Sequence, residues 1–363
     1  MKKYNFYAGP AILPEWVMQE AAKSVIEFEN SGLSIIEMSH RSKDFTVVLD
    51  KAKMLVRDLY RLDNDYEVLF LQGGASLQFL MVPFNLFIEG SRVAYLDTGA
   101  WSSKAIKEAK YFGDVVTVAS SSDRGYSYIP KSFNIPEDIS YFHFTTNNTI
   151  YGTEIPDSSM LKLNTSHHVP IVADMSSNIF SRQIDASKFD LIYAGAQKNM
   201  GPAGTTLVII KKSILGKVER KIPSMLDYQI HISKGSLFNT GPVFAIYVSM
   251  LTMQWIKNMG GLEIIEKRNK EKAALLYGEI DRNSMFYGTA AVEDRSRMNV
   301  TFLLHDNSQN EAFLNMASEA GIVGIKGHRS AGGFRASIYN AMDLSSVKVL
   351  VELMQEFEQK FAN

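Results

Sequence analysis

Lys198 is the first residue of this chain whose type and position suggest chemistry. It stands in the segment AGAQKNMGPAG (194–204), between two apolar runs. A lysine just past a strand can be an ordinary solvated residue. It can also form a Schiff base, because burial lowers the pKa of the amine and leaves a neutral nucleophile for an aldehyde. The lysine alone is compatible with both interpretations.

Three further segments offer the groups that a pyridoxal phosphate site needs. Asp174 ends the apolar run PIVAD and can cap a helix, or can hold the ring nitrogen protonated. The segment QGGAS (72–76) ends one apolar run and begins another, so its backbone amides and Ser76 can bind a phosphate, although glycines there can also form a plain turn. Trp101 can stack on a ring or simply pack. Together these residues predict a pyridoxal phosphate site.

The elements that would position these residues are seven short apolar runs. Most are separated by segments long enough for a crossover helix, such as 77–87 and 101–112, which predicts an α/β domain with a mainly parallel sheet. Few residues lie between Lys198 and Thr205, so the last two strands should be antiparallel neighbours. The predicted strands are EVLFLQGG (67–74), RVAYLDTG (92–99), VVTVA (115–119), YFHFTT (141–146), PIVADMSS (170–177), LIYAGAQK (191–198) and TTLVII (205–210).

From about Gly241 the pattern changes to long amphipathic helices, which indicates a second unit. This unit should contain a strand at 297–304, a helix near 309–320 and a glycine-rich strand pair at 321–338. A final helix is expected from about Leu344 to Phe361. A chain of 363 residues is long enough for two such domains.

Composition narrows the choice of partner. Hydrophobic residues make up 46% and charged residues 21%, and the net charge is −1, so we expect a small-molecule ligand and no nucleic-acid or membrane partner. The N-terminus lacks the apolar stretch of a signal peptide, and we expect a cytoplasmic protein. With no cysteine, a thiolate nucleophile and a cysteine zinc site are excluded. His167 and His168 are interpreted as loop residues, and no metal is expected.

Several blocks, in order along nearly the whole chain, resemble the class V aminotransferases among the fold-type I pyridoxal phosphate enzymes. The resemblance implies an aspartate-aminotransferase-like fold with a seven-stranded sheet, a large domain at 16–255, a small α/β domain formed by 1–15 and 256–363, and a homodimer. The blocks are FYAGPAILP (6–14), MSHRSKDF (38–45), QGGASLQF (72–79), ADMSSNIFSRQID (173–185), YAGAQKNMGPAG (193–204), SMLDY (224–228), FNTGP (238–242), SRMNVTF (296–302) and KGHRSAGGFRASIYNA (326–341).

The resemblance also implies roles for individual residues. Lys198 would hold the cofactor and shuttle the proton, Asp174 would pair with the pyridine nitrogen, and Trp101 would stack on the ring. The remaining cofactor contacts would come from Ala75, Ser76 and Gln197 at the phosphate, Thr149 at the ring hydroxyl, and Asn239 and Thr240 of the other subunit. The segment TNNTIYG departs from the family's usual Asn-Glu-Thr at Asn148. By itself, FNTGP favours a helix-capping turn over a phosphate contact.

The implied reaction moves the amino group of L-glutamate to 3-phosphohydroxypyruvate and gives O-phospho-L-serine and 2-oxoglutarate, a step of serine biosynthesis. Use of 4-phosphohydroxy-L-threonine, in pyridoxine biosynthesis, stays open. Arg335 would clamp the α-carboxylate, and the distal anion would meet His40, Arg41, His328 and Arg329, which can also be ordinary surface charges.

Three alternatives are considered. Another class V aminotransferase and a non-catalytic homologue that keeps the fold both stay open. A nicotinamide-binding Rossmann enzyme is disfavoured, because no G-x-G-x-x-G motif occurs.

Overall fold

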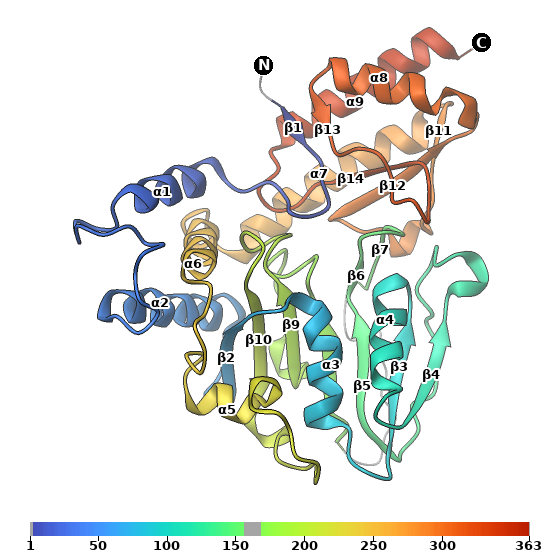
Figure 1. The fold of residues 1–363 in the computed structure, drawn as a ribbon. Helices are drawn as coiled ribbons and strands as arrows, with labels where there is room; N and C mark the ends of the chain where they lie inside the picture. The colour runs from blue at the N-terminus through green and yellow to red at the C-terminus, as the bar shows by residue number, and fades with distance from the viewer. Residues whose placement is uncertain (1–2, 156–167, 363) are drawn as a thin grey trace.

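The computed structural model describes residues 3–155 and 168–362 and is built around a seven-stranded sheet (Figure 1). The strand order is β2-β10-β9-β8-β5-β3-β4, and β10 is antiparallel to both β2 and β9. All seven predicted strands and the predicted antiparallel pair are confirmed. The strands are β2 (Tyr66–Leu71), β3 (Arg92–Asp97), β4 (Asp114–Ser120), β5 (Ile139–Thr145), β8 (Ile171–Asp174), β9 (Leu191–Gly195) and β10 (Thr206–Lys211).

Both faces of the sheet are covered, which explains why its strands are continuous apolar runs. Alternate residues of one strand enter different cores: Val68 and Phe70 pack with α1 (Glu15–Ile26), α2 (Lys43–Tyr60) and α6 (Val243–Asn258). Leu69 and Leu71 pack on the opposite face with α3 (Gly74–Leu86), α4 (Ala100–Ala109) and α5 (Tyr228–Ser233). The sheet is therefore a rigid central layer whose strand ends can hold a site.

A second hydrophobic core lies beyond the carboxyl ends of the sheet strands, in the upper part of Figure 1. Phe302 and Phe313 pack edge-to-face against Phe286 there, and Phe6 joins them from the N-terminal segment. The elements are β1 (Tyr4–Asn5), α7 (Leu262–Arg282), β11 (Phe286–Gly288), β12 (Asn299–Leu304), α8 (Asn310–Glu319), β13 (Ile322–Val323), β14 (Phe334–Ser337) and α9 (Leu344–Phe361).

Two expectations about the second unit need correction. The helical pattern that begins near Gly241 does not start the second core, because α6 packs its apolar residues against the first one. The segment 321–338 is not a strand pair: β13 pairs with β1, β14 pairs with β12, and only one isolated bridge joins Lys326 to Phe334. The distant N-terminal strand takes the edge that a local hairpin would have used. The domain boundaries 16–255 and 256–363 stay a prediction.

One further element bears on the site. A short hairpin, β6 (Asn147–Asn148) and β7 (Thr153–Glu154), follows β5 and extends toward the second unit.

Across 3–155 and 168–362, no helix combines the length and the apolar character that crossing a membrane requires.

Candidate active site

Asp174 and Lys198 open into the same cavity at the carboxyl ends of two neighbouring strands. Asp174 is the last residue of β8, and Lys198 follows β9, which pairs with β8 in parallel. The cavity has a volume of about 440 Å³. Of the residues predicted from the sequence, it is lined by Ala75, Ser76, Trp101, Thr149, Asp174, Gln197, Lys198, His328 and Arg335.

The amine of Lys198 is held in a form that can react. Burial lowers its pKa to about 8, the carboxylate of Asp174 opposes this shift, and the cation of Arg335 adds to it. The Nζ atom lies 5.3 Å from the ring centroid of Trp101. A substantial part of the lysine is therefore neutral near pH 8, as a nucleophile or a proton acceptor must be.

The carboxyl group of Asp174 is buried, and its position is fixed by the strand ends. Burial raises its pKa, while Lys198 and a hydrogen bond from the backbone of Ser176 favour the charged form. The Ser176 amide donates to Oδ1 at 2.9 Å, and the Gly195 amide donates to the Ser176 hydroxyl at 3.2 Å. A cationic group placed in the cavity would stabilise this carboxylate.

Trp101 is fixed in the first turn of α4. Its indole Nε1 donates to the hydroxyl of Thr149 at 2.9 Å. Ser102, the next residue, donates to Asp97 at the end of β3 at 3.0 Å and accepts from the Thr98 amide at 2.9 Å. The aromatic ring is therefore a preset wall of the cavity.

The N-terminus of α3 forms an anion-binding cradle. Gly73 and Gly74 have φ angles of +86° and +65°, a left-handed conformation that favours glycine. They turn the chain from β2 into α3, so that Ala75 and Ser76 line the cavity. The first amides of a helix have no partner within it, and the helix dipole favours negative charge there.

Arg335 comes from the second unit and reaches the opposite side of the cavity. It lies on β14, and its Nη1 donates to the backbone oxygen of Thr149 at 3.2 Å. Its Nε is buried and has no hydrogen-bond partner among the described residues. Since a guanidinium can bind a carboxylate with two parallel bonds, this free donor is suited to an acid ligand.

His328 lines the cavity beside Arg335. Its pKa is lowered by burial and by the cations of Arg335, Arg329 and Lys104. A second cavity of about 400 Å³ shares Ile150, His328 and Arg335 with the first. The group facing Arg335 therefore meets positive charge and an imidazole whose charged form is disfavoured.

Five predicted site residues do not line this cavity in the single chain. His40 is half-buried, whereas Arg41 and Arg329 are exposed. Asn239 donates its amide to the side chain of Gln72, and Thr240 is exposed. Their roles stay predictions.

Two histidines, His167 and His168, are predicted from the sequence to be loop residues and not metal ligands. His167 lies outside the described residues, and His168 is exposed, with Nε2 3.2 Å from Asp190. Within 3–155 and 168–362 no group of three potential metal ligands occurs.

The structure adds lining residues to which the sequence analysis gave no role. Ala8 and Gly9 reach the cavity because the N-terminal strand β1 pairs with β13, and the Ala11 amide donates to the Gln197 oxygen at 2.9 Å. The block FYAGPAILP was the available signal for them. Phe79, Ile150 and Ser176 also line the cavity, and their signal was their place in the segments QGGASLQF, TNNTIYG and ADMSSNIFSRQID.

Comparison with known proteins agrees with this geometry. The aminotransferase class-V family matches residues 3–350. The phosphoserine aminotransferase of Flavobacterium psychrophilum is 58% identical and aligns over 99% of this chain and 100% of its own. The solved phosphoserine aminotransferase of Bacillus circulans subsp. alkalophilus is 40% identical, with a TM-score of 0.95 and 99% of each chain covered. That of Trichomonas vaginalis, solved with pyridoxal phosphate bound, is 37% identical, with a TM-score of 0.90 over 98% of this chain and 100% of its own. By its fold and its full-length relatives, the chain belongs to the class V aminotransferase family and, within it, to the phosphoserine aminotransferases.

Proposed function

We propose that this chain transfers the amino group of L-glutamate to 3-phosphohydroxypyruvate, which yields O-phospho-L-serine and 2-oxoglutarate. The observation that carries the proposal is the cavity in which Lys198 and Asp174 face the free guanidinium donor of Arg335. The relatives described above carry the name of this activity. The cofactor is pyridoxal 5′-phosphate.

The residues present fit this cofactor. The α3 N-terminus, with Ala75 and Ser76, suits its phosphate, and Gln197 would contribute there. Asp174 would pair with the ring nitrogen, because a buried carboxylate with a raised pKa needs a cationic partner to stay ionised. Trp101 would cover the ring, and Thr149 would meet its hydroxyl side. Lys198 would hold the cofactor covalently.

When bound, pyridoxal phosphate supplies an electron sink that makes the Cα proton of an amino acid removable. The chain's own residues would then supply binding and proton transfer. Arg335 would bind the α-carboxylate common to both substrates and so orient the Cα–H bond. The neutral amine of Lys198 would accept this proton and return it at the neighbouring carbon. Trp101 would exclude water from one side.

The distal anion of each substrate would meet His328, together with Arg329, His40 and Arg41. This part of the proposal includes a homodimer. Large apolar side chains are exposed on both sides of His40 and Arg41 along the chain, including Ile26 at 85%, Ile36 at 61% and Val47 at 66%. Large apolar side chains left exposed in the single chain are available for burial against a second copy. A second copy on this face would bring His40 and Arg41 toward the neighbouring cavity. A cytoplasmic location is part of the same proposal.

The half-reaction tests the proposed activity. Addition of L-glutamate to the purified protein should shift the cofactor absorption, and 3-phosphohydroxypyruvate should reverse the shift. A different class V aminotransferase would respond to glutamate without this reversal, and a non-catalytic homologue would not respond. Addition of 4-phosphohydroxy-L-threonine in place of L-glutamate, as the amino donor, decides whether this amino acid is also a substrate, because a substrate should shift the absorption as glutamate does. Lys198→Ala should abolish covalent trapping of the cofactor by borohydride and is the control.

Subunit mixing tests the dimer. One chain carries Lys198→Ala and the other carries Asn239→Ala with Thr240→Ala, so that each homodimer is nearly inactive. If Asn239 and Thr240 act on the other subunit's cofactor, the heterodimer contains one complete site and activity returns. If they act within their own chain, mixing restores nothing.

A further inference from the structure

The second unit is joined to the hairpin of β6 and β7 by a set of buried polar side chains, which we call the polar seam. On the side of the large unit the seam comprises residues 146–154 and 176–182. On the side of the small unit it comprises residues of α7, of β12 and of the segment before β12. Gly152, with φ +73°, leaves no room for a Cβ atom beside Thr301 of β12. The backbone oxygens of Tyr151 and Gly152 accept hydrogen bonds from Thr301 and Ser296, at 3.2 and 2.8 Å. The hairpin therefore belongs to the large unit by chain position but is packed against the small one.

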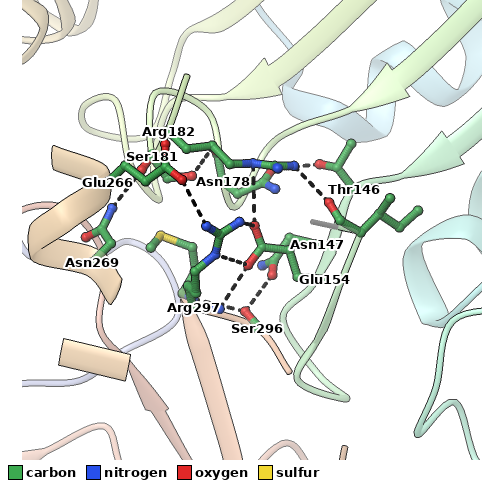
Figure 2. Close-up of polar contacts among 12 residues, drawn as sticks. Thr146, Asn147, Glu154, Asn178, Ser181, Arg182, Glu266, Asn269, Ser296 and Arg297 are labelled. Atoms are coloured by element: carbon green, nitrogen blue, oxygen red, sulfur yellow. Dashed lines mark hydrogen bonds and ion pairs between the residues drawn. The ribbon is translucent and has the colours of Figure 1, made fainter. Parts of the chain in front are cut away.

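The outer part of the seam is a cluster of opposite charges. Glu154 is buried and pairs with Arg297 at 3.1 Å and with Arg182 at 3.8 Å. Arg297 also reaches Glu266 of α7 at 3.3 Å (Figure 2). Since the partners come from both units, the cluster resists separation of the units.

The inner part of the seam is a bond between two buried asparagines. The amide of Asn147 donates to the Asn299 oxygen at 2.8 Å and to the Ser177 hydroxyl at 2.7 Å. Its own oxygen accepts from Ser296 at 2.5 Å, the contact drawn in Figure 2. The exposed fractions of Asn147 and Asn299 are 2% and 0%. Every polar atom of the Asn147 side chain is thus used to join the two units.

The asparagine bond lies directly behind groups that touch the substrate and the cofactor. Asn299 opposes Ser337 on β14 and donates to its hydroxyl at 3.0 Å, two residues from Arg335. Asn299 also donates to Tyr339 at 3.1 Å, and Tyr339 donates to the oxygen of Ala8 in the cavity wall at 2.8 Å. Asn147 precedes Thr149 by two residues on the other side.

We infer that Asn147 and Asn299 are positioning residues that set Arg335 at a fixed place relative to Thr149 and the cofactor ring. This inference rests on the proposed function, since it assigns Arg335 the α-carboxylate. Without the bond, β14 would lose its tether through Asn299 to the large unit, and the side chain of Arg335 would keep its single bond to the Thr149 oxygen. The loss should fall on acid binding and not on cofactor binding, because Asp174 ends a strand of the large sheet and Lys198 directly follows another.

The test uses the cofactor-loaded protein with Asn299→Ala, Asn147→Ala and the double variant. The probe is glutarate, a dicarboxylate without an amino group, and its dissociation constant is read from the cofactor absorption. Asn283→Ala is the matched control, because Asn283 is equally buried but bonds to Glu279 and to Met354 within the small unit. Ser337→Ala is a milder variant that removes one bond of Asn299 and keeps the proposal testable if Asn299→Ala folds poorly.

We expect each single asparagine variant to weaken glutarate binding by about tenfold, the size of one lost charge-assisted contact. The double variant should lose less than the sum of the two single variants, because both remove the bond between Asn147 and Asn299. The KM values for both substrates should rise together while kcat changes less, and the cofactor content of Asn299→Ala should stay unchanged. Ser337→Ala should give a smaller effect in the same direction, and Asn283→Ala should leave glutarate binding as it is.

Additive losses in the double variant would overturn the inference, as would an equal loss in Asn283→Ala or a loss of cofactor alone. Absence of glutarate binding to the wild-type protein would refute the clamp and the inference with it. Failure of glutamate to shift the wild-type absorption would instead refute the proposed function, and the glutarate titration would still report on the seam.

Discussion

The lowered pKa of Lys198 has a measurable consequence in the protein freed of its cofactor. With a pKa of about 8, roughly one tenth of the amine is neutral at pH 7, whereas a lysine at the ordinary value of 10.5 has about 0.03% in this form. At pH 7 the neutral fraction is therefore about 300-fold larger. The rate of acylation of Lys198 should rise with pH and level off above about pH 8.

Two substitutions should move this midpoint in opposite directions. The carboxylate of Asp174 raises the pKa of Lys198, so Asp174→Asn should shift the midpoint below 8. The cation of Arg335 lowers the same pKa, so Arg335→Ala should shift the midpoint upward. The two signs follow from the charges alone.

The assay is competitive labelling with trace acetic anhydride between pH 6 and pH 9.5, with the acetylated peptides quantified by mass spectrometry. The exposed Lys110 in the same digest serves as the internal reference. A Lys198 rate that still climbs steeply at pH 9.5 would refute the reasoning from burial. A shift of both variants in the same direction would refute the assignment of the two neighbouring charges.

Three further outcomes follow from the structure. Asp174→Asn should retain the cofactor but slow the single-turnover reaction with glutamate by at least about 100-fold in stopped flow, because an amide cannot hold the ring nitrogen protonated; an unchanged rate would remove Asp174 from the mechanism. Lys272, buried against the oxygens of Ile338 and Tyr339, has a pKa lowered to about 7, so the unfolded chain binds more protons between about pH 7 and 10.5 and stability should rise with pH in this window. The melting temperature of Lys272→Met should depend less on pH there, and equal slopes would contradict this account. Gly152→Ala should lower the free energy of unfolding by about 2–4 kcal/mol in thermal unfolding. Gly32 has the same φ of +73° but open space around it, so Gly32→Ala should cost only the free energy of the strained backbone conformation. Equal losses in the two variants would rule out the steric contact with Thr301.

The large sheet could be predicted from sequence because its signal is local. Every strand except the edge strand β4 is largely buried and so appears as an apolar run, and the short link after Lys198 leaves an antiparallel neighbour as the available geometry. The final helix also has the bounds that its amphipathic pattern indicated, Leu344–Phe361. Asp174 and Lys198 meet because parallel neighbouring strands end at the same edge.

What escaped prediction depends on partners far away in sequence. The β13 strand pairs with β1 and not with its neighbour β14, and no pattern within 321–338 announces an N-terminal partner. Asn147 and Asn299 have ordinary polar surroundings in the sequence, and their importance appears only when the hairpin and β12 come together. His40 and Arg41 do not line the cavity of the single chain, so their proposed role depends on a second copy of the chain.

The pairing of β1 with β13 has a consequence for how the protein is made. Tyr4 leaves the ribosome long before its partner Ile322 is synthesised. Ala8 and Gly9 therefore cannot take their places in the cavity wall until almost all of the chain has emerged. The sheet, whose contacts are complete by β10, can form earlier, and docking of the N-terminal strand would be a late and slow step because it closes a very long loop. A newly made chain would pass through a stage in which its core is folded and its active site is still open.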